Sequence, residues 1–419
     1  MKIFFRASMP LLSNASITDN FFAPISGLAE SSPFARACPG LSDTACLKLG
    51  VTRVLSDASS GRGFLQQIGI SIEDCPRHSS FFETLKSKRR LSVLNNVNVR
   101  LASLMKPAAE MPDLFKDYAL FAADGHWHAA ATHDAHIDEK RWAVGHFYAY
   151  DMRSEALLHI TATEGKKEHD MHALKRAGAE QLRLNIKKGR KVLLVWDRAG
   201  IDFRLWHDWK HQNGIYFISR TKENMRLDVI ARIPFDQSDE LNHGIIADEL
   251  VSTSQHVSVR RVTYREPVKG EIFEYITTVM DLPPGAIAWL YKRRWEIEKI
   301  FDQLKNKFGE TKAWASSLNA KAMQATFLCL THNLTVIFER GLAEQGIEDV
   351  AGRKRQESRL QKQVEFTSKL LRPMSTLLTK VLRPLVRSVK LIRWFRAHWF
   401  SAAPLRDLLD HLRRLYATL

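Results

Sequence analysis

Four side chains of different chemistry recur at helical spacing late in the chain: Tyr291, Arg294, Glu298 and Lys305. At about 100° of rotation per residue, a helix brings all four within an arc of about 60° that flanks an apolar stripe. One phenol, two cations and one carboxylate therefore point in the same direction, at the border of a predicted core. A solvated helix face would instead show outward Glu and Lys pairs, so the pattern indicates a functional site.

Two further carboxylates lie upstream, each where a predicted strand ends. Asp124 follows a strand that begins near Tyr118, and Asp197 follows the continuous apolar run 191–196. A run of this kind is typical of a strand buried on both faces. Together with Glu298 these residues offer three carboxylates, and carboxylate oxygens are the ligands that hard divalent cations such as Mg2+ prefer.

The elements around these carboxylates predict an α/β fold with a mixed sheet. Their order is three strands, a helix, a strand, a helix and a strand, which is the order of a ribonuclease H-like sheet. In such a sheet Asp124 and Asp197 lie on adjacent strands. After the first strand, the predicted elements are strands 144–150 and 156–160, helix 169–185, strand 191–196, helix 201–210 and strand 215–219.

A β-rich insertion is predicted between Asp197 and Glu298. These two residues are separated by 100 others, where one helix, one strand and their loops need only about 35. The surplus, at about 222–282, is rich in Val, Ile and Thr. Pro283 and Pro284 end it, and one long amphipathic helix that carries the whole polar stripe is predicted to begin near residue 286.

The polar stripe resembles the Tyr-Arg-Glu-Lys signature of DDE transposases from bacterial insertion sequences. The spacing Tyr291-x2-Arg294-x3-Glu298-x6-Lys305 meets that signature at all four positions. Upstream, the aspartates in Ala-Ala-Asp-Gly and in Leu-Val-Trp-Asp-Arg-Ala are similar to the first and second catalytic aspartates of the family. They are Asp124 and Asp197, and the resemblance covers about residues 115–340.

The resemblance implies a DNA endonuclease and strand-transfer enzyme that moves its own mobile element by DNA recombination. Asp124, Asp197 and Glu298 would be the catalytic residues and the ligands of two Mg2+ or Mn2+ ions, which suit phosphodiester chemistry because they act on both the attacking and the leaving oxygen. Asp202 is the alternative to Asp197, although it falls inside the next helical pattern. Cut-and-paste transposition is the implied route, with a hairpin on the element ends as one variant.

Tyr291, Arg294 and Lys305 would, by the same resemblance, hold phosphates at the transposon end. An arginine suits this role because its planar fork grips phosphate oxygens in a bidentate manner. The alternative for Arg294 is a structural ion pair with Glu298, four residues further along the helix. The implied partners are double-stranded DNA, both terminal inverted repeats and target DNA, and a second copy of the chain in a homodimeric synaptic complex.

A rival interpretation starts from the histidines that follow Asp124. His126, His128, His133 and His136, with Asp134 and Asp138, could bind zinc in a metal-dependent hydrolase. No later His or Cys pair with matching ligand spacing lies near Asp197, which disfavours this class. A third class is a DNA-binding relative that has lost catalysis, and it is disfavoured because all three carboxylates are present.

The charge of the chain predicts an anionic partner. The 419 residues carry a formal charge of +16, and residues 351–419 alone hold 16 Lys or Arg against 4 Asp or Glu. Clustered cations favour nucleic acid through counterion release. Four cysteines without a CxxC pair and a broken apolar start predict a cytoplasmic protein, and the resemblance implies a bacterial, nucleoid-associated one. The apolar stretch 322–338 is predicted to be a buried helix and not a membrane span.

Helical regions are predicted on both sides of a catalytic domain at 113–345. Residues 1–112 are expected to begin loosely ordered, with helices near 63–68 and 79–87 that read either as a helix-turn-helix for DNA ends or as a plain helical subdomain. Residues 346–419 are expected to form short basic helices. The segment 390–400, in which aromatics alternate with cations, is compatible with DNA binding, dimerisation or a membrane surface.

Overall fold

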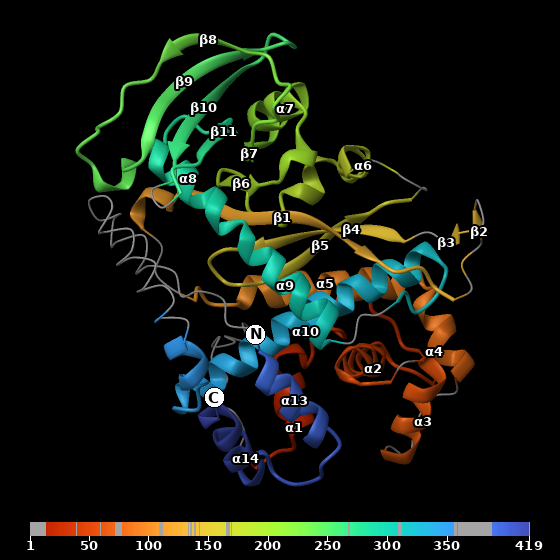
Figure 1. Cartoon of the computed structure of the whole chain (residues 1–419). Helices are drawn as coiled ribbons and strands as arrows, with labels where there is room; N and C mark the ends of the chain where they lie inside the picture. The colour runs from red at the N-terminus through yellow and green to blue at the C-terminus, as the bar shows by residue number, and fades with distance from the viewer. Residues whose placement is uncertain are drawn as a thin grey trace.

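The computed structural model describes most of the chain. The residues described are 14–38, 40–58, 60–71, 78–108, 112–132, 134, 136–137, 140–141, 143–164, 168, 170–266, 269–308, 312–355, 358 and 388–418. A nine-stranded sheet lies at the centre, helices cover both of its faces, and the first and last helices of the described residues lie together on the side away from the long antiparallel strands (Figure 1).

The first five strands of the sheet have the ribonuclease H-like arrangement, in the order β5-β4-β1-β6-β7. β1 pairs antiparallel with β4 and parallel with β6, and β6 pairs parallel with β7. The predicted fold class is therefore confirmed. These strands are β1 (Tyr118–His128), β4 (Val144–Asp151), β5 (Leu157–Ala162), β6 (Lys191–Val195) and β7 (Ile215–Arg220).

The predicted β-rich insertion continues the same sheet. β11 pairs antiparallel with β7, and the remaining insertion strands follow in the order β10-β9-β8. They form the long curved ribbons at the top of Figure 1. The bounds are β8 (Leu227–Arg232), β9 (Ile245–Thr253), β10 (Ser258–Arg265) and β11 (Ile272–Thr277). A separate two-stranded ladder joins β2 (His136–Ile137) to β3 (Lys140–Arg141).

Alternation along β1 divides its side chains between two cores. Leu120 and Ala122 face the larger core with α5, α9 and α10, whereas Phe121 and Ala123 face a second core with α6 and α7. Because successive side chains of a strand point to opposite faces, Asp124 lies on the face covered by α9. These helices are α5 (Lys88–Leu104), α6 (Asp170–Leu182), α7 (Phe203–Asn213), α9 (Trp295–Lys307) and α10 (Leu318–Glu344).

Helix α10 runs through the larger core and confirms the prediction of a buried helix at 322–338. The buried amide of Asn333 on this helix forms hydrogen bonds inside the fold: Asn333 Oδ1 accepts from the Leu157 amide at 2.7 Å, and Asn333 Nδ2 donates to Asn98 Oδ1 at 2.9 Å. Among the described residues, no helix combines the length and the apolarity that a membrane span requires.

The expectation of one continuous helix from residue 286 is wrong. Two helices follow each other, α8 (Pro284–Arg293) and α9, and Arg294 is the residue between them. The Arg294 backbone is still helical, but it donates its N–H to the Tyr291 carbonyl, three residues back, instead of continuing the regular pattern. The break lies at Arg294, whose side chain contacts Asp124 on β1 and Glu298 on α9, as described below.

The expectation of a loosely ordered start is also wrong for the residues that the structure describes. Helix α1 (Ile17–Phe22) is capped by Ser16, and helix α2 (Asp43–Leu55) is capped by Ser42. The two predicted helices are present as α3 (Gly61–Ser71) and α4 (His78–Leu85). Of the basic residues near 86–90, Arg89 forms hydrogen bonds of 2.6 and 2.7 Å to Asp43. Its charge therefore joins helices within the N-terminal region.

The C-terminal helices α13 (Val389–His398) and α14 (Leu405–Ala417) pack on the N-terminal ones. Trp394 and Phe395 are fully buried, and the Phe395 ring lies 5.0 Å from that of Phe21 on α1. The buried aromatic side chains of 390–400 therefore belong to this chain's own core and are not available to a membrane or to a second copy. Much of the basic segment before α13, residues 359–387, lies outside the described residues.

Candidate active site

The strand register places Asp124 and Asp197 at the same level of the sheet. In the parallel pair β1 and β6, Ala122 is opposite Val195, so the aspartates, each two residues further on, lie at the same level. Asp197 follows the end of β6, whereas Asp124 lies inside β1, which continues to His128 and so does not end where the sequence predicted. Asp197 caps the short 3-10 helix at 198–200, and its Oδ1 accepts from the Ala199 amide at 2.8 Å. Gly125 donates its amide to Asp124 Oδ1, also at 2.8 Å.

Helix α9 carries Glu298 to the same place. Its apolar face, including Ile297 and Ile300, is buried against the sheet, and Phe301 stacks on His126 of β1 with ring centroids 4.9 Å apart. This packing fixes the helix directly over the strand that bears Asp124. The Glu298 side chain stays partly open to solvent, at 36% exposure.

Arg294 joins the two carboxylates. Its Nη1 donates to Asp124 Oδ2 at 2.6 Å, and its Nη2 donates to Glu298 Oε1 at 2.9 Å. The arginine side chain is only 8% exposed. The ion pair with Glu298 that the sequence allowed is therefore present, together with a second pair to a residue 170 positions away.

The three carboxylates influence one another electrostatically. The pKa of Asp124 is raised to about 6: burial is the largest cause, the negative charges of Asp197 and Glu298 add to it, and the Arg294 guanidinium and the Gly125 amide oppose it. Crowded carboxylates disfavour ionisation of one of their number. The positive charge of Arg294 therefore offsets only part of the negative charge at this edge of the sheet.

The other two stripe residues lie in different surroundings. Tyr291 is largely buried, its ring is 4.9 Å from that of Tyr275, and the Arg294 guanidinium carbon lies 5.8 Å from its centroid. Burial raises the pKa of Tyr291, so the phenol stays protonated. Lys305 is exposed on α9, almost two turns beyond Glu298. The structure therefore brings Tyr291 and Arg294 together and leaves Lys305 on the surface.

Asp202, the alternative second carboxylate, has a structural role. It caps α7 by accepting from the Leu205 amide at 3.0 Å, and it pairs with Lys175 at 2.7 Å. Both contacts lower its pKa against the effect of burial.

The histidines behind the rival interpretation are packed into the sheet. His128 Nε2 lies 2.8 Å from the Tyr148 hydroxyl, and beside it are two histidines that the sequence analysis did not single out, with His146 Nδ1 3.1 Å from His159 Nε2. Burial lowers the pKa of His159 to about 3. Asp134 pairs with Lys321 at 2.9 Å. His133 and Asp138, and the side chain of His136, lie outside the described residues.

The donor chemistry of the carboxylate site fits a hard divalent cation, since all three groups offer oxygen. Within the part of the chain that the structure describes, no three His, Cys, Asp or Glu side chains are arranged to hold a metal ion. At the carboxylate site, Arg294 lies between Asp124 and Glu298 and forms an ion pair with each of them.

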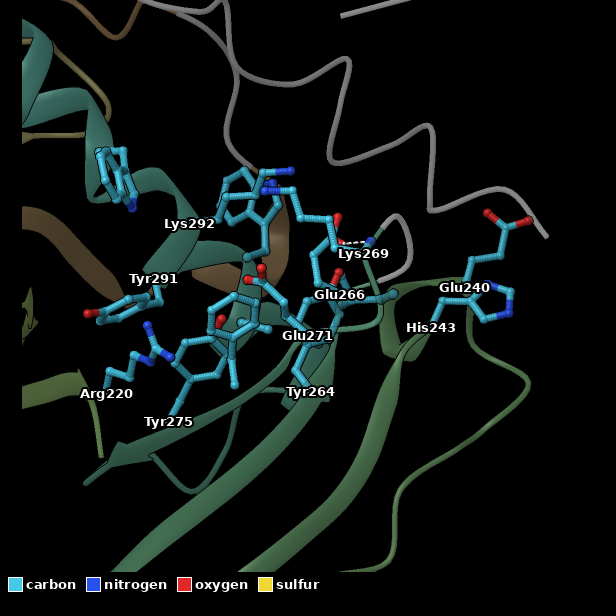
Figure 2. Close-up of a pocket in the computed structure, with 16 residues that line it drawn as sticks. Arg220, Glu240, His243, Tyr264, Glu266, Lys269, Glu271, Tyr275, Tyr291 and Lys292 are labelled. Carbon is cyan, nitrogen blue, oxygen red and sulfur yellow. Dashed lines mark hydrogen bonds between the residues drawn. The ribbon is translucent and has the colours of Figure 1, made fainter. Parts of the chain in front are cut away.

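A cavity of about 450 Å³ opens beside Tyr291, between α8 and the insertion strands (Figure 2). Arg220 and Tyr275 converge on Tyr291 at its inner end, and Arg220 lies 4.6 Å from the Phe273 ring centroid. The aromatic side chains that line it are Tyr264, Phe273, Tyr275, Trp289, Tyr291 and Trp295. The sequence analysis did not identify this cavity, although Phe273 and Tyr275 alternate along one predicted strand and so must share a face.

Acidic residues on adjacent strands of a ribonuclease H-like sheet, with a third on a covering helix, are the arrangement that the sequence resemblance implied. The family model described as a transposase DDE domain matches residues 117–334, which is more than half of the chain. The chain therefore belongs to this family of DDE transposases, and the expected resemblance is confirmed.

Among solved structures, the chain is similar to the piggyBac transposase in a cryo-EM structure of its synaptic complex with hairpin DNA. Sequence identity is 10% and the TM-score is 0.39, over 89% of this chain and 80% of that one. No curated protein sequence matches the chain.

Proposed function

We propose that this transposase cuts and joins DNA at the ends of its own insertion sequence, with Asp124, Asp197 and Glu298 as the catalytic residues. The observation that carries the proposal is their convergence: two adjacent strands and one covering helix bring three acidic side chains together, and the pKa of Asp124 responds to both of the others. Neither the capping Asp202 nor the buried histidines share this environment.

The three carboxylates would hold Mg2+ or Mn2+, with two ions expected. When bound, such ions activate the attacking oxygen and stabilise the leaving oxygen of a phosphodiester. Water would attack at the transposon end, and the 3′ hydroxyl that is released would attack the target strand. The protein's own contribution is to fix the carboxylates on rigid elements, so that little reorganisation is needed during the reaction.

DNA would approach the open side of α8 and α9. Lys305 is exposed there and would contact a phosphate, whereas Arg294 and Tyr291 lie deeper, beside the carboxylates. The aromatic cavity of Figure 2 suits a base that has left the duplex, because stacking on aromatic faces tolerates any base and Arg220 adds a positive charge. A homodimer would bring two ends together, as cut-and-paste transposition requires.

The proposal is tested by incubating the purified protein with Mg2+ and labelled duplexes that carry the inverted repeats flanking its gene. We expect a nick at the boundary of the element that exposes a 3′ hydroxyl. A duplex of the same composition with a scrambled repeat is the control and should stay intact. Equal cutting of both duplexes would contradict end-specific transposition, and no cutting of either would contradict catalysis.

A further inference from the structure

We infer that Arg294 is a latch that fills a cation position between Asp124 and Glu298 until a DNA phosphate draws it away, so that DNA binding and metal loading are coupled. The inference rests on the proposed function, because it assumes that these carboxylates are metal ligands. It goes further by giving Arg294 two alternative partners and an order of events.

The contacts of Arg294 exclude a metal ion from the same oxygens. The two Nη atoms lie 2.6 Å from Asp124 Oδ2 and 2.9 Å from Glu298 Oε1, so one planar group spans both carboxylates. A divalent cation that bridges Asp124 Oδ2 and Glu298 Oε1 must displace this guanidinium, because it would occupy the same position. Metal and arginine therefore compete directly for the same negative charge.

Displacement costs free energy unless the arginine finds a new anion. Breaking a buried ion pair leaves an uncompensated charge, which is strongly destabilising. The Arg294 side chain is 8% exposed, so water does little to compensate. One phosphate can accept hydrogen bonds from both Nη atoms, which now donate to two separate carboxylates. DNA is thus the partner whose chemistry fits the released guanidinium.

The local structure gives the side chain an alternative place. Arg294 lies at the break between α8 and α9, where the helix is not continuous. Its guanidinium carbon lies 5.8 Å from the Tyr291 ring and 5.9 Å from the Trp295 ring. The Trp295 side chain is exposed and lines the cavity of Figure 2, so one of the two rings beside the guanidinium faces solvent.

The test measures Mn2+ binding to the full-length, DNA-free protein by the electron paramagnetic resonance of free Mn2+. Arg294→Gln keeps the size of the side chain but removes the charge, and we expect it to bind Mn2+ about ten times more tightly than the wild type. Arg294→Lys keeps the charge but cannot span two carboxylates, so it should fall between the two. It also serves as the informative variant if Arg294→Gln does not fold.

Arg293→Gln is the matched control. Arg293 is the adjacent arginine, and it pairs with Glu296 at 2.6 Å, so its loss should leave Mn2+ affinity within about twofold of the wild type. Adding a short duplex with the inverted repeat should raise the Mn2+ affinity of the wild type by more than that of Arg294→Gln, because linkage requires the coupling to be reciprocal.

The outcomes separate the inference from the proposed function. Mn2+ affinity that falls in Asp124→Asn but is unchanged or weaker in both Arg294 variants would overturn the latch and leave the metal site in place. Mn2+ affinity that is the same in the wild type and in Asp124→Asn would overturn the metal site itself, and the latch with it.

Discussion

Strand β1 carries two clusters of polar side chains on one face, and they have opposite properties. Asp124 belongs to the first cluster, with Asp197, Glu298 and Arg294. The second cluster begins two residues later and contains His126, His128, His146, His159 and Tyr148. The carboxylate cluster reaches solvent through Glu298, whereas His128 and His146 are fully buried.

The difference shows that closeness in sequence does not define a site. Asp124, His126 and His128 form a plausible metal-ligand set when read along the chain. In the fold, Asp124 pairs with Arg294, which directly precedes the helix that covers the strand, whereas His126 stacks on Phe301, about two turns further along. Helix α9 thus contributes a charged side chain, Glu298, to the first cluster and an apolar ring, Phe301, to the second.

The largest effect is expected when the carboxylate cluster is broken. Asp124→Asn, Asp197→Asn and Glu298→Gln should each lower the rate of end cleavage by at least about a thousandfold, because each removes ligands that stabilise several kcal/mol of developing charge. End binding, measured by gel shift, should stay close to that of the wild type. Near wild-type nicking by one of these variants would remove that residue from the site.

Asp202→Asn is the matched control for the carboxylates. It removes a partly exposed ion pair with Lys175 but keeps an oxygen that can cap α7, so it should cost at most about 1 kcal/mol of stability. Cleavage should be unchanged at a temperature where the variant is folded. Cleavage lost in Asp202→Asn but kept in Asp197→Asn would exchange the roles of these two aspartates.

The histidine cluster should affect stability in acid. The pKa of His159 is lowered by burial to about 3, below its ordinary value of 6.5. The unfolded chain therefore binds this proton first, and stability is lost as the pH falls below about 6.5. At pH 5 the loss from this group is about 2 kcal/mol. His159→Gln cannot titrate, so its free energy of unfolding should fall less between pH 7 and pH 5.

Urea unfolding of both proteins at the two pH values measures this difference. Cleavage at pH 7.5 should be similar in His159→Gln and in the wild type, and insensitive to a zinc-selective chelator. An equal loss of stability in both proteins would mean that His159 is already accessible to protons. Cleavage that stops with the zinc chelator and is not restored by Mg2+ would instead favour a histidine metal site.

The smallest effect is expected at the exposed end of α9. Lys305→Ala should weaken DNA binding only modestly and reduce the slope of log K against log salt by about 0.9, the value for one phosphate contact on duplex DNA. Lys390→Ala is the control, because Lys390 is held by Asp349 at 2.8 Å within the fold. The opposite ranking of the two slopes would place the DNA on the C-terminal helices.

The sequence predicted those features that depend on local patterns. The apolar run before Asp197 and the spacing of Tyr291, Arg294 and Glu298 are readable within a few turns or one strand. The pairing of Arg294 with Asp124 spans 170 positions and depends on how α9 crosses the sheet, so no local pattern contains it.

The terminal regions were harder for the same physical reason. Helix α1 has only six residues, too few to be stable alone, and it is held by the contact of Phe21 with Phe395 near the other end of the chain. The alternation of cations and aromatics at 390–400 identifies an amphipathic helix but not what covers its apolar face. That surface turned out to be the N-terminal helices of this same chain.

The most direct test of a metal-dependent carboxylate site is sulfur substitution at the scissile phosphate. End cleavage is timed on duplexes that carry an oxygen or a sulfur at the non-bridging position, in Mg2+ and in Mn2+. Because Mg2+ binds oxygen much better than sulfur, the account predicts that sulfur slows cleavage in Mg2+ and that Mn2+ restores much of the rate. Equal rates for both substrates in Mg2+, at every stereoisomer of the phosphorothioate, would contradict a metal ion in contact with the reacting phosphate.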